Sequence, residues 1–248
     1  MKTICLCQAR ITSKRLPRKV LKPIYKDFNA LDLIYLRLGR SRLIDELKYV
    51  IPDSDSNIEL RKYLEANNYN FSTGDENDLI NRYLNAVQSH RDCLIVRVTS
   101  DCPLVDPQIV DKAISIYRDL ELDYVATYAP AKNSKYCNGS DVEVFSKKLL
   151  ERIEHNFPSG KDKEHVTFPL WDGRLPNLKT LLMSPEDGED FSTVRITLDY
   201  KSDLTVLSRL LEYANDIHAS LAELVKLYKK HGLGKINSDI AYDQGWKQ

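Results

Sequence analysis

The 248-residue sequence lacks a long apolar run, a net charge and any zinc-type cluster of cysteine and histidine. No run approaches the roughly 18 apolar residues of a membrane span. The 36 basic and 36 acidic residues cancel, so no overall field favours nucleic acid. Five scattered cysteines, with Cys5-x-Cys7 fitting no metal site, indicate reduced thiols. With no signal-peptide pattern at the start, we expect a globular, cytoplasmic protein without membrane or nucleic-acid partners.

Short apolar runs alternate with stretches of helical spacing over the first half of the sequence. Strands are predicted at 3–7, 47–51, 69–71, 93–98 and 124–128, with helical periodicity between them. Such alternation is typical of an α/β protein. It predicts a mostly parallel sheet with helices on both faces.

The pattern changes at about residue 130. A polar loop is followed by a strand at 142–145, a helix at 147–156 and a mixed segment. We therefore expect a small inserted α+β lobe over 130–190, within a single domain spanning 1–248. A strand at 194–198 is predicted to rejoin the sheet, and two helices near 204–211 and 221–227 close the chain.

A basic loop follows the first predicted strand, at residues 8–21. It contains cations and hydroxyls but no carboxylate: Arg10, Thr12, Ser13, Lys14, Arg15 and Lys19. Open α/β sheets bind ligands at the carboxyl ends of their strands. Cations and hydroxyls there suit a polyanion such as a triphosphate. A solvated basic loop would have the same composition, and this alternative stays open here.

Two aspartates occupy matching positions after apolar strands. Asp101 is the first carboxylate after 94–98, and Asp199 is the first after 194–198. Both are expected at the same rim as the basic loop. Carboxylate oxygens beside phosphates suit Mg²⁺, which would neutralise charge on the transferring group. Asp after a strand is also common as a turn or cap residue.

The basic loop resembles the nucleotide-binding signature of cytidylyltransferases that make CMP-activated sugar acids. The shared pattern is Gln8-Ala9-Arg10-x-x-Ser13-x-Arg15-Leu16-Pro17-x-Lys19-Val20-Leu21. It is more closely similar to the spore coat polysaccharide biosynthesis protein F family. Five further segments resemble that family in order: 74–83, 97–107, 139–145, 164–167 and 195–200.

The resemblance implies a Rossmann-like nucleotide-diphospho-sugar transferase fold that uses CTP and Mg²⁺. The residues implied to hold the nucleotide are Arg10, Ser13, Arg15, Lys19 and Arg82. Asp101 and Asp199 match the metal-binding aspartates, and with Lys19 they form the implied catalytic set. The residues implied to shape the sugar site or a dimer contact are Asp141, Glu143, Glu164 and His165. The segment 130–190 would then serve substrate binding and homodimerisation.

The implied reaction is attack by a sugar-acid hydroxyl on the α-phosphate of CTP, releasing pyrophosphate, for surface polysaccharide synthesis. The sequence departs from the family pattern at three positions. Thr12, Arg18 and Ser100 stand where many relatives have glycine. Because glycine lets the backbone approach phosphate closely, an inactive nucleotide-binding relative is an alternative.

Two other enzyme classes compete with this interpretation. A glycosyltransferase of similar fold would need an Asp-x-Asp motif, for which Asp53-x-Asp55 is a candidate in a turn. A hydrolase could use Cys102 with His165. Arg97 and Arg195 lie in apolar strands, where an arginine either pairs with a buried carboxylate or binds an anionic substrate.

Overall fold

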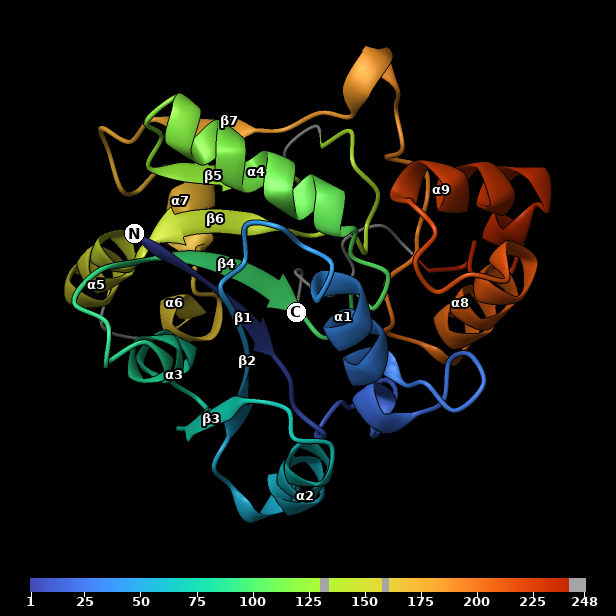
Figure 1. Ribbon diagram of the computed structural model, residues 1–248, viewed down its shortest axis with the longest axis horizontal. Coiled ribbons are helices and arrows are strands. Elements are labelled where there is room, and N and C mark those ends of the chain that lie inside the picture. The colour runs from blue at the N-terminus through green and yellow to red at the C-terminus, as the bar shows by residue number, and fades with distance from the viewer. Residues whose placement is uncertain (130–133, 158–160, 241–248) are drawn as a thin grey trace.

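A single seven-stranded sheet organises the chain (Figure 1). The computed structural model describes residues 1–129, 134–157 and 161–240. The strands are β1 (Lys2–Gln8), β2 (Glu46–Pro52), β3 (Phe71–Gly74), β4 (Cys93–Thr99), β5 (Tyr124–Ala126), β6 (Glu143–Ser146) and β7 (Thr180–Leu182). Their order is β3-β2-β1-β4-β6-β5-β7. All neighbours pair in parallel except β6, which is antiparallel to β4 and β5.

Helices cover both faces of this sheet (Figure 1). One face is covered by α1 (Ala30–Leu38), α2 (Ile58–Ala66), α4 (Pro107–Asp119), α8 (Lys201–Ala214) and α9 (Leu221–Lys230). The other is covered by α3 (Leu79–Ala86), α5 (Lys147–Asn156) and α7 (Phe168–Trp171), and α6 (Lys161–Glu164) contacts α3. The short 3₁₀ turns are η1 (Lys19–Leu21), η2 (Asp55–Asn57), η3 (Glu186–Gly188) and η4 (Leu233–Lys235).

The alternation of strand side chains produces two hydrophobic layers. In β1, Cys5 and Cys7 face the α1 side, whereas Ile4 and Leu6 face the α3 side. All five cysteines are buried and free, as expected for small apolar side chains. The predicted α/β class, the mostly parallel sheet and the helices on both faces are confirmed.

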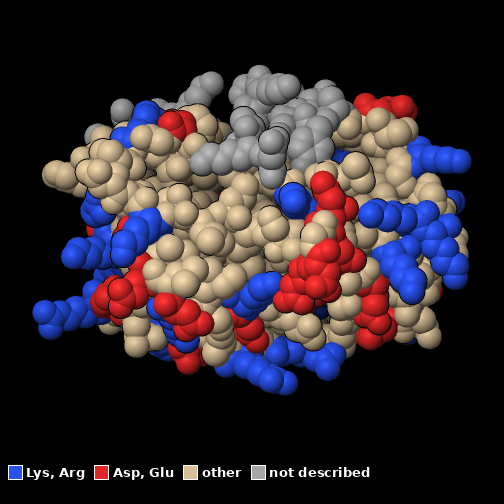
Figure 2. Space-filling model, turned by 90° about the horizontal axis from the view of Figure 1, so that it is seen from above, with Lys and Arg blue, Asp and Glu red and all other residues tan. Residues whose placement is uncertain are grey.

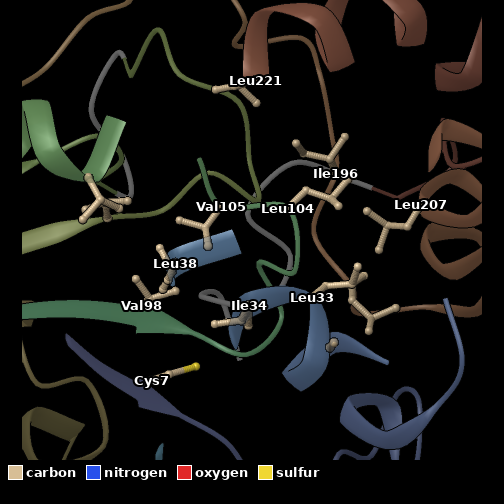
Figure 3. Close-up of a cluster of buried hydrophobic side chains, with 14 of the residues drawn as sticks. Cys7, Leu33, Ile34, Leu38, Val98, Leu104, Val105, Ile196, Leu207 and Leu221 are labelled. Carbon is tan, nitrogen blue, oxygen red and sulfur yellow. The ribbon is translucent and has the colours of Figure 1, made fainter. Parts of the chain in front are cut away.

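The segments that carry the candidate site are anchored in the larger layer (Figure 3). Val105 after β4 and Leu38 of α1 belong to this cluster, as do Ile196 and Leu207 of α8. Each fully buried side chain of this kind contributes about 1.5–3 kcal/mol. The loop after β4 and the segment before α8 are therefore fixed by packing.

The segment 130–190 joins the main sheet through β6 and β7. Strand β6 lies between β4 and β5, so this segment supplies an interior strand. Residues 130–133 and 158–160 lie outside the described part of the chain. Its role as a substrate or dimerisation lobe stays a prediction.

The predicted strand at 194–198 is wrong. This segment makes one isolated bridge, between Asn138 and Arg195. The Ile196 N–H donates to the Asn138 carbonyl at 2.9 Å, and the Leu198 N–H donates to the Asp101 carbonyl at 2.8 Å. Its hydrogen bonds therefore go to loops at the rim of the sheet and form no ladder.

Gly139 allows the backbone of residues 196–197 to pass close to its own backbone. Its φ is +108°, and a Cβ there would lie 2.4 Å from the Thr197 nitrogen. Only glycine fits this contact. The approach positions 195–199 beside the end of β4.

The surface matches the balanced composition. Acidic and basic side chains are interspersed over the face seen in Figure 2. Among the described residues, no helix combines the length and apolar character that a membrane crossing requires.

Candidate active site

A cavity of about 640 Å³ opens at the carboxyl ends of β1 and β4. The basic loop, the start of α3, the segment before β6 and residues 195–200 also line it. Nearly all predicted site residues lie in its wall: Arg10, Ser13, Arg15, Lys19, Arg82, Asp101, Asp141, Glu143, His165 and Asp199. Glu164 ends α6, and its side chain lies outside the described part of the structure. One cavity thus gathers residues that are distant in the sequence.

Lys19 joins the two strand-end aspartates. Its ammonium nitrogen lies 3.3 Å from Asp101 Oδ2 and 3.0 Å from Asp199 Oδ1. Arg15 Nη2 lies 2.7 Å from the same Asp199 oxygen. The Thr99 hydroxyl donates to Asp101 and orients its carboxylate. Two carboxylates therefore converge on one cationic position.

This ion-pair cluster shifts the pKa values of Lys19 and Asp199. Burial alone would lower the pKa of Lys19, but attraction by Asp101 and Asp199 raises this pKa above 10.5. Burial alone would raise the pKa of Asp199, but Lys19 and Arg15 hold this pKa below 3.8. Lys19 and Asp199 are therefore both charged near neutral pH.

These shifts predict how stability depends on pH. Since the folded-state pKa of Asp199 is lowered, its stabilisation is full above about pH 4, the unfolded-state value, and is lost as pH falls below that value through the lowered folded-state pKa. The raised pKa of Lys19 affects stability at alkaline pH. The contribution of Lys19 to the free energy of unfolding is full below about pH 10 and is lost as pH rises above that value. We expect Asp199→Asn to be less stable than wild type near neutral pH. Urea unfolding across acid pH should show this difference shrinking, and an unchanged difference would contradict the assignment.

The geometry suits a divalent cation. Carboxylate oxygens are the ligands that Mg²⁺ prefers. The Asp101 and Asp199 carboxylates already contact one cationic group, the Lys19 ammonium. Within the described ranges, no group of three or more His, Cys, Asp or Glu side chains could hold a metal. A metal here would therefore take its remaining ligands from phosphate oxygens and water.

Asp203 of α8 fixes the position of Asp199 through hydrogen bonds to its backbone and to Arg195. It is fully buried and accepts from Arg195 Nε at 2.9 Å and Nη2 at 2.8 Å. It also accepts the backbone N–H groups of Asp199 and Tyr200, both at 3.0 Å. Sequence reasoning missed this residue. Its position in the first turn of α8, where an acidic side chain caps the helix, was the available signal.

We expect Asp203→Asn to lower the free energy of unfolding by about 1.5–3 kcal/mol, since Arg195 loses its buried carboxylate partner and keeps only the more distant Asp199, at 3.6 Å. Urea denaturation measures the change. Asp27→Asn, at an exposed aspartate, is the matched control and should have no comparable effect. A loss for Asp203→Asn no larger than the control's would contradict this role.

A second buried ion pair forms the floor of the cavity. Arg97 of β4 and Glu143 of β6 are opposite each other in register and are hydrogen-bonded. Glu143 also accepts from the Thr167 hydroxyl at 2.7 Å and from Trp171 Nε1 at 3.2 Å. Both Arg97 and Arg195 thus pair with buried carboxylates while lining the cavity.

Asp141 reaches this cavity because β6 is antiparallel. Its oxygen accepts the Gly139 N–H at 3.2 Å. Burial and the nearby Asp101 carboxylate raise the pKa of Asp141 to about 7. Near neutral pH this carboxyl is therefore partly protonated and adds less than a full negative charge.

Arg82 has a different environment from the other cavity cations. It is 4% exposed, and its guanidinium donates to the Asp75 carbonyl at 3.0 Å and the Glu76 carbonyl at 2.8 Å. It therefore holds the loop after β3. Arg10 and Lys14 are exposed and, among the described residues, form no ion pair. These two cations are available to an anionic ligand.

Thr12, Arg18 and Ser100, which stand where many relatives have glycine, differ in backbone conformation. Arg18 has φ +59°, in the left-handed region that favours glycine. Thr12 and Ser100 have no such conformation. The Thr12 hydroxyl donates to Glu76 at 3.2 Å, and the Ser100 N–H donates to the Gln8 carbonyl at 3.0 Å. A side chain at these two positions therefore requires no backbone strain.

Two of the competing enzyme classes find no support here. Cys102 is 1% exposed, and burial raises its thiol pKa well above 9.0, which opposes a nucleophilic role. Asp53 and Asp55 are exposed and do not line the cavity. An Asp-x-Asp donor site is therefore not formed by these residues.

Fold and cavity together define an α/β protein with a basic loop and two carboxylates at the edge of a mostly parallel sheet. A sequence model of the cytidylyltransferase family matches residues 4–231. The chain belongs to this family and is a CTP-dependent nucleotidyltransferase. The resemblance noted in the sequence is confirmed.

Individual relatives agree with this assignment. A cytidylyltransferase structure from Leptospira borgpetersenii is 26% identical, covers 98% of this chain and 99% of its own, and has a TM-score of 0.86. Spore coat polysaccharide biosynthesis protein SpsF of Bacillus subtilis is 26% identical over 232 residues, which are 91% of this chain and 93% of that protein. CMP:2-keto-3-deoxy-manno-octonic acid synthetase, solved with CTP, covers 86% of this chain and 100% of its own at 13% identity, with a TM-score of 0.62. This last likeness shows the shared fold.

Proposed function

We propose that this protein transfers CMP from CTP to a hydroxyl of a sugar acid, releasing pyrophosphate, in surface polysaccharide biosynthesis. The observation that supports this most is the Lys19 bridge between Asp101 and Asp199 beside the basic loop. Membership of the cytidylyltransferase family supports CTP as the nucleotide substrate. The names of two relatives indicate that the acceptor is a sugar. A homodimer formed through 130–190 and a cytoplasmic location belong to the same proposal.

The basic loop would bind the triphosphate. Arg10 and Lys14 line the cavity and have no carboxylate partner among the described residues, and Ser13 adds a hydroxyl. Arg15 can grip phosphate oxygens with its forked guanidinium, whereas Lys19 acts as a point charge. Arg82 would shape the nucleotide side through the loop that it holds. Nucleotidyl transfer depends mainly on such positioning and charge neutralisation.

Mg²⁺ fits as the cofactor of this site. Asp101 and Asp199 would hold it together with CTP phosphate oxygens. When bound, it supplies charge neutralisation at the α-phosphate and pyrophosphate, and lowers the pKa of the attacking hydroxyl. Lys19 would then exchange its contacts with the carboxylates for contacts with phosphate.

The other end of the cavity would take the acceptor. Glu143 is neutralised by Arg97, and Asp141 is partly protonated near neutral pH, so repulsion of an acceptor carboxylate is small. Asp141, Glu143 and His165 all line the cavity. Glu164 belongs to the same group in the proposal.

A pyrophosphate-release screen tests the proposal. CTP, UTP, ATP and GTP should each be offered with a panel of nonulosonic and octulosonic acids and their neutral sugar counterparts. We expect release with CTP, a sugar acid and Mg²⁺ together. CTP binding by calorimetry without turnover on any acceptor would instead indicate a non-catalytic relative.

A further inference from the structure

A second cavity, of about 430 Å³, lies apart from the candidate active site and shares no lining residue with it. It is formed where α1, the start of α4 and the start of α9 meet. Its cationic and hydrogen-bonding side chains are Arg37, Arg40, Arg42, Gln108, His218 and Ser220. We propose that this cavity is a binding site for a phosphate group, separate from the CTP site.

Arg37 supplies a fixed buried charge. It is fully buried, and it donates to the Val105 carbonyl at 2.9 Å, the Leu104 carbonyl at 3.0 Å and the Ala219 carbonyl at 3.1 Å. Among the described residues it forms no ion pair with a carboxylate. Carbonyls satisfy its hydrogen bonds, and burial lowers the pKa of Arg37 to about 10, so the attraction by Asp106 and Asp216 compensates its charge only in part.

The two aspartates in the wall offset only part of the charge of the three arginines, and backbone donors hold both carboxylates in place. Asp106 accepts the backbone N–H groups of Gln108 at 2.9 Å and Leu221 at 2.7 Å. Asp111 accepts those of Arg42 at 2.9 Å and Leu43 at 3.2 Å. Both carboxylates are thus engaged by backbone donors.

Arg40 and Arg42 provide the adaptable part of the site. Both are exposed, and within the described ranges neither guanidinium forms an ion pair. Arginine binds phosphate through two parallel N–H donors, so this pair suits a doubly charged group.

His218 adds a polar atom that lacks a partner. Its Nδ1 is buried and has no hydrogen bond within the described structure. Burial, Arg40 and Arg37 lower the pKa of His218 below 6.5, and Asp216 opposes this shift; Asp106 and Asp111 also line the cavity. A bound anion would favour the protonated ring, which then donates to it.

The test uses the full chain and follows the His218 ring by NMR, with the resonance assigned from His218→Gln. Orthophosphate, pyrophosphate and CMP are titrated separately at constant ionic strength, which distinguishes a free phosphate from one carried by a nucleotide. We expect a saturable shift of His218 with at least one probe. The Arg40→Gln/Arg42→Gln variant should weaken that binding by at least about tenfold, since hydrogen bonds to charged groups are the strong ones.

Controls separate this cavity from the active site. Arg91→Gln, at an exposed arginine outside both cavities, should bind as wild type does. Arg10→Gln/Lys14→Gln alters the CTP cavity and should leave the His218 shift intact. Sulfate, which keeps its charge across this range, should bind more tightly as pH falls through the His218 pKa. No saturable shift at His218, or wild-type affinity in the double variant, would overturn the proposal.

Discussion

Asp101→Asn is expected to lower kcat for CMP transfer by at least about 10²-fold while CTP still binds. The substitution keeps the size of the side chain but removes the charge that a divalent cation needs. Loss of one charge-stabilising group at a transition state costs about 10²–10³-fold in kcat. Pyrophosphate release under saturating CTP measures the loss.

Asp92→Asn is the matched control for this experiment. Asp92 is exposed just before β4, at the opposite end of the strand from Asp101. The same chemical change there should leave kcat unaltered. Full Mg²⁺-dependent turnover in Asp101→Asn would remove Asp101 from the catalytic set and from the metal site.

The sequence predicted the part of the site that lies next to long buried strands. The apolar strands β1 and β4 are readable from their runs of buried residues, and the residues after them fall at one edge of a parallel sheet. Arg10, Lys19 and Asp101 were therefore placed correctly relative to one another.

Short segments were less predictable. Val194, Ile196 and Leu198 alternate as in a strand and are all buried, yet their hydrogen bonds go to loops. Periodicity reports burial of one face and does not identify the hydrogen-bond partner. The direction of β6 is equally invisible in its four residues, although it decides that Glu143 meets Arg97.

The second cavity was not predicted from the sequence because its lining residues come from three separate segments, 37–42, 106–111 and 218–220. Arg40, Gln108 and His218 share no spacing or motif. Their proximity results from the packing of α1, α4 and α9, which Arg37 stabilises through carbonyls of two loops. Only tertiary structure brings such residues together.

Lys19→Met is expected to lower kcat/KM for CTP by at least about 10²-fold, and Lys14→Met by much less. Both lysines belong to the basic loop, but only Lys19 is buried and contacts both aspartates. An ammonium in a partly buried site acts through a lower effective dielectric than an exposed one, so its charge has the larger effect on phosphate.

The comparison also separates a catalytic from a structural role for Lys19. A purely structural loss would lower the free energy of unfolding and be reversed by a stabilising ligand, leaving kcat near the wild-type value. A catalytic loss persists in folded protein at saturating CTP. Lys19→Arg, which keeps the charge but changes its geometry, should recover binding more than kcat. Equal effects of Lys19→Met and Lys14→Met on kcat/KM would show that the loop acts only through its total charge.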